Sequence, residues 1–226
     1  TWPDLSRDLF RRAFSFLPKE RAVDTPEVVN RIKLHAATPA ILKAWVEQNP
    51  AGNNARTAWE DACRIFGDPR WLGAELRERA PGDFSEAELV KIAEWTQLQE
   101  RRLSHWVEGE RGEGAELDEE DEALLLRLHQ LRAGPLKRRG RPVSLAHLVV
   151  DEVQDLAPLE IAVLLELADK HGCVTLAGDT RQHVLEDTGF DAWSDLLDGL
   201  DGSGVELSNL EIGYRSTARI SAFAHR

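Results

Sequence analysis

The spacing of hydrophobic positions changes once along the chain, near residue 145. Before that point, apolar residues recur at helical intervals, and the helical segments are bounded by recognisable capping residues. From Leu145 onward, short apolar runs alternate with helical patterns. The pattern therefore predicts a helical subdomain over residues 1–107 and an alternating β/α portion from residue 145.

Capping signals locate the ends of the predicted helices. Three Thr-Pro or Asp-Pro pairs each place a side-chain oxygen before a proline suited to the first helical position. They are Thr25-Pro26, Thr38-Pro39 and Asp68-Pro69. Ser85 to Glu88 has the form of a capping box, which predicts a helix reaching Val107. Gly52 and Gly67 indicate helix ends.

Five tryptophans fall on these predicted helices. We interpret them as core residues of the helical subdomain, because large aromatic side chains bury much apolar surface. Stacking of an exposed tryptophan on a nucleic-acid base is the alternative. The five residues are Trp45, Trp59, Trp71, Trp95 and Trp106.

Residues 108–144 form a linker with an acidic and a basic part. Between Glu108 and Glu122 there are nine acidic residues and one arginine, which together supply −8 of the net charge of −12. Asp118 can cap a leucine-rich helix that ends before Gly134-Pro135, and residues 137–144 are expected to form a basic loop. We interpret both charge runs as solvated surface, with a phosphate-backbone contact as the alternative for the basic one. The basic cluster consists of Lys137, Arg138, Arg139 and Arg141.

The β/α portion, residues 145–212, predicts a parallel sheet. Strands are expected at 146–151 and 173–177, with a helix at 158–170 between them and a third strand around 205–212. A connection of this length fits a βαβ crossover, so the carboxyl ends of the first two strands should lie at the same edge. That edge would carry Asp151, Glu152, Asp179 and Gln182.

Two adjacent carboxylates at that edge suit a Mg²⁺-nucleotide. One carboxylate can help hold the metal, and the other can orient or deprotonate a water. An apolar run such as Leu148 to Val150 is typical of a buried strand in a parallel sheet, and ligands bind at the carboxyl ends of such strands. The alternative is a strand that runs into an acidic surface turn.

Three segments together resemble motifs of the UvrD/Rep-like superfamily 1 DNA helicases. Residues 151–155 (DEVQD) match motif II, residues 178–182 (GDTRQ) match motif III, and residues 213–216 (GYRS) resemble motif IV. The resemblance is closer still to the HelD-like branch, which acts on RNA polymerase. It implies an α/β fold that is part of a RecA-like P-loop NTPase sheet of about three strands. Residues 1–107 would be a 1B-like helical insertion, and residues 213–226 would begin a second RecA-like domain.

The resemblance also assigns roles to single residues. Asp151 would position Mg²⁺, and Glu152 would orient and deprotonate the water that attacks the γ-phosphate of ATP. Gln154 and Asp155 would brace the site and link it to neighbouring loops. Gln182 would contact the γ-phosphate. Tyr214 would stack on the adenine, and Arg215 would stabilise charge in the transition state.

The 226 residues lack a phosphate-binding loop and contain no methionine. The chain has no G-x-x-x-x-G-K-[ST] loop, so it lacks the cradle of backbone N–H groups and the lysine that hold phosphates. It has no methionine either. We therefore expect an internal fragment of a larger ATPase, inactive by itself.

The segment after Gln182 leaves the function open between three alternatives. True helicases continue motif III with an aromatic residue that stacks on a base, whereas this chain continues with His183-Val184-Leu185-Glu186-Asp187. Base stacking contributes about 1–3 kcal/mol per base, so its loss weakens the hold on single-stranded DNA. The first alternative is a motor that moves on DNA, single-stranded or at a duplex junction. The second is an RNA polymerase-binding ATPase without unwinding, and the third is a non-hydrolysing scaffold.

Composition agrees with a cytoplasmic globular protein. The hydrophobic content is 42%, and no apolar run approaches the roughly 20 residues that cross a bilayer. We therefore expect no membrane association. Cys63 and Cys173 are expected to be reduced, the first in a helix and the second in a buried strand.

Overall fold

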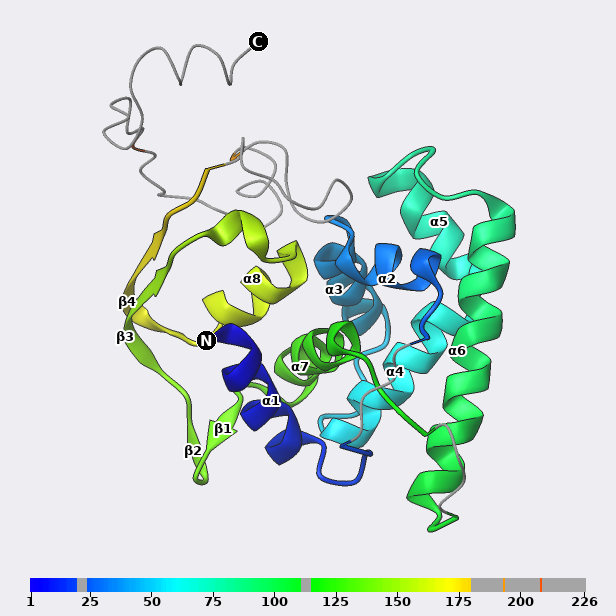
Figure 1. The fold of residues 1–226 in the computed structure, drawn as a ribbon, viewed down its shortest axis with the longest axis horizontal. Coiled ribbons are helices and arrows are strands. Elements are labelled where there is room, and N and C mark those ends of the chain that lie inside the picture. Colours follow the sequence, from blue (N-terminus) through cyan, green and yellow to red (C-terminus); the bar gives the residue numbers. More distant parts are fainter. Residues whose placement is uncertain (20–23, 111–114, 180–192, 194–207, 209–226) are drawn as a thin grey trace.

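Helices dominate the mixed α/β fold of the computed structural model, which describes residues 1–19, 24–110, 115–179, Trp193 and Ser208. The helical body consists of α1 (Trp2–Ala13), α2 (Glu27–Leu34), α3 (Thr38–Gln48), α4 (Ala55–Gly67), α5 (Pro69–Arg79), α6 (Glu86–Val107) and α7 (Glu119–Ala133). Helix α7 lies in the middle of this body and contacts α1, α2, α3 and α4 (Figure 1). Its leucines Leu124, Leu126 and Leu128 are buried there.

Three predicted helix starts are confirmed by their capping contacts. Asp68 accepts hydrogen bonds from the backbone N–H groups of Arg70 and Trp71 at the start of α5. Ser85 and Glu88 form the expected capping box of α6. Asp118 caps α7 and forms a second box with Asp121.

The two Thr-Pro pairs do not cap helices, and both predictions are wrong in the same way. The Thr38 hydroxyl donates instead to the carbonyl of Ile32, at 2.5 Å, and α3 begins at Thr38 itself. The Thr25 hydroxyl donates to Asp118 Oδ2, at 2.7 Å, and α2 begins only after Pro26. In each case a partner outside the helix competes successfully for the threonine side chain.

The tryptophans pack as the sequence predicts. Trp59 is buried, and the other four are partly buried against the same hydrophobic core. Trp45 and Trp71 meet edge to face with ring centroids 4.8 Å apart. The Trp45 indole N–H donates to Asp61 and that of Trp71 to Gln48, so their polar atoms have partners in the protein.

Charged groups also lie inside the helical body, in two places. Arg132 on α7 binds Asp61 on α4 at 2.5 Å, and both side chains are almost fully buried. Lys33 on α2 lies 2.8 Å from Asp118 and 2.7 Å from Asp121. Both clusters join α7 to other helices.

The basic segment after α7 forms a small antiparallel hairpin rather than a loop. Strands β1 (Lys137–Arg138) and β2 (Arg141–Pro142) pair across the turn residues Arg139 and Gly140. Both turn residues have positive φ, 51° and 78°, as a two-residue type I′ turn requires. Asn-Gly is the usual sequence for such a turn, so Arg-Gly gave little signal of it.

The β/α portion contains the predicted parallel βαβ unit. Strand β3 (Leu145–Val150) is followed by a short 3₁₀ turn, η1 (Val153–Asp155), by helix α8 (Pro158–Leu165) and by strand β4 (Ala168–Leu176). The strands pair in parallel, with His147 opposite Cys173 and Val150 opposite Leu176. Apart from Ser208, the third predicted strand lies outside the described residues, which contain this two-stranded sheet and the hairpin.

Strand β4 begins five residues earlier than predicted, and α8 is correspondingly shorter. The backbone N–H of Leu145 donates to the Leu167 carbonyl, and the Ser144 hydroxyl donates to Asp169. A Cβ atom at Gly172 would lie 2.8 Å from the Leu145 carbonyl oxygen, so glycine permits this close approach. These contacts align residues 168–172 with the start of β3.

The prediction that the first two strands are buried is wrong. Leu148 is the one buried residue of β3, while Val149 and Val174 are 61% and 41% exposed. Cys173, expected in a buried strand, is exposed. Helix α8 connects the sheet to the body: Leu148, Leu159 and the buried residues of α7 belong to one continuous core.

None of the described helices is both long enough and apolar enough to cross a membrane.

Candidate functional site

The acidic pair lies where the sequence places it, directly after β3 at the carboxyl end of the parallel strands. Asp151 and Glu152 are both exposed. The Asp151 carboxylate accepts a hydrogen bond from the backbone N–H of Glu152, at 3.0 Å. We call these two residues, with Gln154 and Asp179, the acidic rim.

Glu152 has a left-handed backbone conformation, with φ 52° and ψ 44°. A residue with a side chain pays roughly 1–2 kcal/mol for this conformation. The chain bends at Asp151 and Glu152 between β3 and η1, and Glu152 is exposed there. Strain of this kind is typical of functional sites, where a side chain must be held at a particular place.

Gln154 connects the two halves of the acidic rim. Its side chain is buried, with 5% exposed. Its Nε2 atom donates to Glu152 Oε2 at 2.7 Å, and its Oε1 atom accepts from the backbone N–H of Asp179 at 3.1 Å. One amide therefore links the catalytic candidate after β3 to the segment after β4.

Backbone contacts hold these two segments together as well. Ala177 donates to the Val150 carbonyl at 2.8 Å, and Val153 donates to the Ala177 carbonyl at 3.0 Å. At Gly178 a Cβ atom would lie 2.4 Å from Gln154 Oε1 and 2.9 Å from Val153 Cγ1. The glycine of the Gly178-Asp179 pair thus allows the chain to pass closely over Gln154.

The remaining predicted site residues, Gln182, Tyr214 and Arg215, lie outside the described residues. Their predicted convergence on Asp151 and Glu152 stays a prediction. The described residues contain no group of three or more His, Cys, Asp or Glu side chains arranged to hold a metal ion by themselves. Two exposed carboxylates do suit Mg²⁺, which keeps several waters and is commonly bound by one or two carboxylates together with phosphate oxygens.

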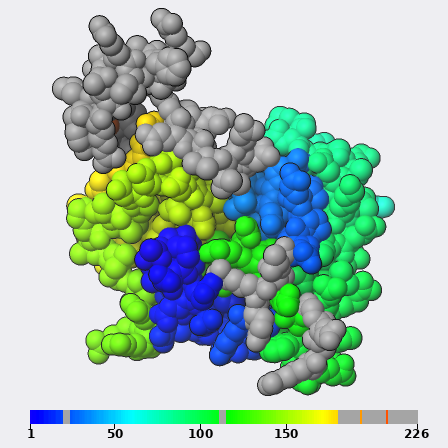
Figure 2. Space-filling view, viewed as in Figure 1, coloured from blue at the N-terminus to red at the C-terminus, as the bar shows by residue number. Residues whose placement is uncertain are grey.

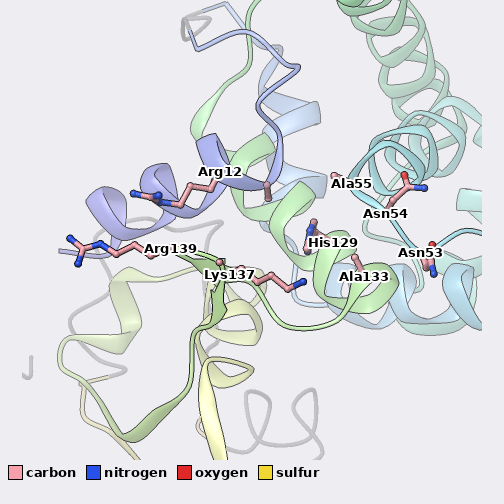
Figure 3. Close-up of a pocket in the computed structure, with 10 residues that line it drawn as sticks. Arg12, Asn53, Asn54, Ala55, His129, Ala133, Lys137 and Arg139 are labelled. Atoms are coloured by element: carbon pink, nitrogen blue, oxygen red, sulfur yellow. The ribbon is translucent and has the colours of Figure 1, made fainter.

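A basic cavity of about 480 Å³ lies at the other end of β3. It is bounded by α1, the amino-terminal end of α4, the carboxyl-terminal end of α7 and the β1–β2 hairpin (Figure 3). Its polar lining consists of Arg12, Asn53, Asn54, His129, Lys137 and Arg139. No carboxylate is among the described residues that line it, although the chain carries a net charge of −12.

Two basic residues of this cavity have no ion-pair partner within the described part of the chain. Arg12 binds Asp8 at 2.8 Å, and Asp8 also contacts Arg138 at 3.2 Å. Lys137 and Arg139 form no ion pair with a carboxylate of the described residues. Their charges are therefore available to a ligand.

His129 lies beside Lys137 in this cavity (Figure 3). Burial, together with the Lys137 charge, lowers the pKa of His129 below its usual value. Its Nδ1 atom is buried and has no hydrogen-bond partner in the protein. No pattern in the sequence pointed to these residues: Asn53 and Asn54 lie far along the chain from the basic cluster, and His129 lies within the leucine-rich helix α7.

Comparisons of the chain with protein-family models, with curated proteins and with solved structures found no match.

Proposed function

We propose that this chain is part of an ATP-dependent motor of the UvrD/Rep-like kind, which couples ATP hydrolysis to movement on nucleic acid or to remodelling of its complexes. The observation that carries the proposal is the acidic rim. Two exposed carboxylates follow the first of two parallel strands, and a buried glutamine ties them to the segment that follows the second strand. Ligands of α/β proteins bind at this edge of the sheet.

In this proposal each residue of the rim has one task. Asp151 would help hold Mg²⁺, directly or through its water shell, and the metal would supply neutralisation of the phosphate charge. Glu152 takes the proton from the attacking water. Gln154 keeps the Glu152 carboxylate in place through the 2.7 Å hydrogen bond. Gln182 and Arg215 would contact the γ-phosphate, and Tyr214 the adenine.

The proposal requires a phosphate-binding loop, which the 226 residues do not contain. ATP hydrolysis is therefore tested in a protein that includes both this chain and such a loop. Glu152→Gln should lower the rate of hydrolysis by at least 100-fold, because general-base catalysis contributes about 10²–10⁴. Nucleotide binding should remain nearly unchanged, because the amide retains the shape of the side chain.

Glu94→Gln is the matched control for this experiment. Glu94 is exposed on α6, in the helical body, and its substitution removes the same charge. Its ATPase rate should equal that of the wild type. Hydrolysis that is equally fast in Glu152→Gln and in the wild type would remove Glu152 from the mechanism and the proposal with it.

An RNA polymerase-binding ATPase of the HelD-like kind is the second candidate. It is favoured by the segment after Gln182, which has no aromatic residue to stack on a base. The two candidates differ in what they act on. Retention on immobilised RNA polymerase without strand separation supports the second candidate, whereas strand separation without retention supports the first.

A further inference from the structure

The basic cavity is large, concave and positively charged in a chain that is otherwise strongly acidic. Figure 2 shows the β1–β2 hairpin projecting beside α1 at the surface of the molecule. The cavity between them is bordered by Lys137 and Arg139, and the part of its lining that the structure describes contains no carboxylate. A concave surface of one sign focuses the electrostatic potential and raises the local concentration of ligands of opposite charge.

The cationic side chains of the lining extend in opposite directions rather than toward one point. The Lys137 side chain extends toward His129, at the carboxyl-terminal end of α7, while Arg139 and Arg12 extend in the other direction (Figure 3). A single small anion would reach one end of this arrangement only. A ligand that carries several phosphates in a row can reach both.

Polar groups of neutral side chains complete the lining. Asn53 and Asn54 face the cavity from the start of α4. Asn54 caps that helix by accepting from the Thr57 N–H, so its side-chain NH₂ group remains for another acceptor. Phosphate oxygens are acceptors that such amide donors bind well. The His129 ring lies in the same lining, with its Nδ1 atom buried.

The hairpin turn presents one of these charges at an energetic cost. Arg139 occupies a left-handed position of the turn, with φ 51°, where asparagine or glycine is the common choice. The same turn could be made without a charge. The choice of arginine at this position is therefore better explained by a ligand that its guanidinium group binds than by the conformation of the turn.

We propose that the basic cavity binds an extended phosphate-bearing anion, with Lys137 and Arg139 as its principal contacts. The ligand is either a single nucleic-acid strand, through its backbone, or a free polyphosphate. The site is separate from the acidic rim, which lies at the opposite end of β3, and it does not depend on ATP. A failure of anion binding at the basic cavity would therefore leave the proposed ATPase untouched. A failure of the proposed ATPase would equally leave anion binding untouched.

Fluorescence anisotropy of a labelled oligothymidylate tests the nucleic-acid source, and calorimetry with inorganic tripolyphosphate tests the other. Both use the 226-residue chain without nucleotide. The double variant Lys137→Gln/Arg139→Asn should bind the oligonucleotide at least 10-fold more weakly than the wild type. It should also reduce the slope of log K against log salt concentration by about 1.4, since each phosphate contact to a single strand contributes about 0.7.

Two features of this double variant guard against misfolding. Asparagine suits the left-handed turn position better than arginine does, so Arg139→Asn keeps the hairpin. Its thermal unfolding should match that of the wild type. The control variant Lys91→Gln/Arg101→Gln removes the same charge from the exposed face of α6 and should bind as the wild type does.

A second readout follows His129 directly. Bound phosphate should raise the pKa of His129, which a ¹H–¹⁵N NMR titration of the imidazole detects, with His129→Asn to assign the signal. Tripolyphosphate binding that depends on Lys137, without oligonucleotide binding, would assign the site to free polyphosphate. Equal loss of affinity in the two double variants, or no binding of either ligand, would overturn the proposal.

Discussion

The helical body and the β3–β4 sheet differ in where they keep their polar groups. In the body, charged side chains such as Arg132 and Asp61 lie inside the core and bind each other. In the sheet, apolar side chains such as Val149 are exposed, and the polar groups of the acidic rim are held mainly by short local hydrogen bonds. Stability should therefore depend on the body, and chemistry on the end of the sheet.

The largest effect should follow from breaking the buried ion pair of the body. Asp61→Ala leaves the Arg132 Nε–H and the Trp45 indole N–H without an acceptor. Among the described residues, the buried Arg132 charge then keeps only the neutral Asn49 carbonyl. Removing one partner of a buried pair costs about 3–5 kcal/mol. Urea unfolding followed by circular dichroism measures this loss. A loss of less than 1 kcal/mol would mean that the body does not depend on its internal charges.

A cavity in the middle of the body should cost slightly less. Leu126 on α7 is fully buried, and its replacement by alanine removes apolar contacts and leaves a void. Such substitutions cost about 2–5 kcal/mol. Leu126→Ala should lower the urea midpoint clearly, with Leu98→Ala on the partly exposed side of α6 as the milder comparison.

The Lys33 cluster predicts a dependence of stability on pH. Burial and the neighbouring Asp118 raise the pKa of Asp121 to about 7, against an ordinary value of 3.8. A carboxyl group with a raised pKa in the folded state contributes stability that is present below pH 4 and lost as the pH rises through about 7. Asp121→Asn removes this titration while it retains a side chain that can accept the Asp118 N–H bond.

Comparison of the two proteins at pH 5 and pH 8 isolates the effect of Asp121. The wild type should lose on the order of 1–3 kcal/mol of unfolding free energy relative to Asp121→Asn over this range. Burial raises the pKa of Asp118, but the Lys33 charge and hydrogen bonds to Asp118 outweigh it and lower this pKa, so Asp118 stays ionised from pH 5 to pH 8 and its contribution cancels in the comparison. Parallel pH profiles would contradict a raised pKa at Asp121.

The smallest effect should come from the exposed face of the sheet. Val149→Thr keeps the β-branched shape at a position that is 61% exposed. Surface substitutions of this kind change stability by less than about 0.5 kcal/mol. A loss above 1 kcal/mol on urea unfolding would show that this face is covered in solution, which would erase the contrast between the two regions.

Local chemistry explains which parts of the fold could be predicted from the sequence. The starts of α5, α6 and α7 were predictable because Asp68, Ser85 and Asp118 cap backbone groups within three residues of themselves. Thr25 and Thr38 have the same signature, but their hydroxyls bind Asp118 and the Ile32 carbonyl. Those partners lie 93 and 6 residues away and leave no mark on the local pattern.

The same distinction applies to the two sites. The positions of Asp151 and Glu152 follow from strand order alone, since parallel strands end at one edge. The exposure of β3 does not follow, because an apolar run indicates a strand without indicating what covers it. For the basic cavity, the sequence displayed Lys137 and Arg139 as a cluster. It could not show that α4 and α7 would bring Asn53 and His129 beside them.

The Gln154 amide also limits how the end of the sheet can move. Its nitrogen faces the Glu152 carboxylate and its oxygen faces the Asp179 N–H. If the amide were turned by half a rotation, its oxygen would face the Glu152 carboxylate and its NH₂ group would face the Asp179 N–H. One orientation of the amide therefore satisfies both hydrogen bonds. The Gln154 side chain thus joins Glu152 and residue 179 in one fixed orientation, and a shift at one end is either transmitted to the other or breaks a hydrogen bond of this buried side chain.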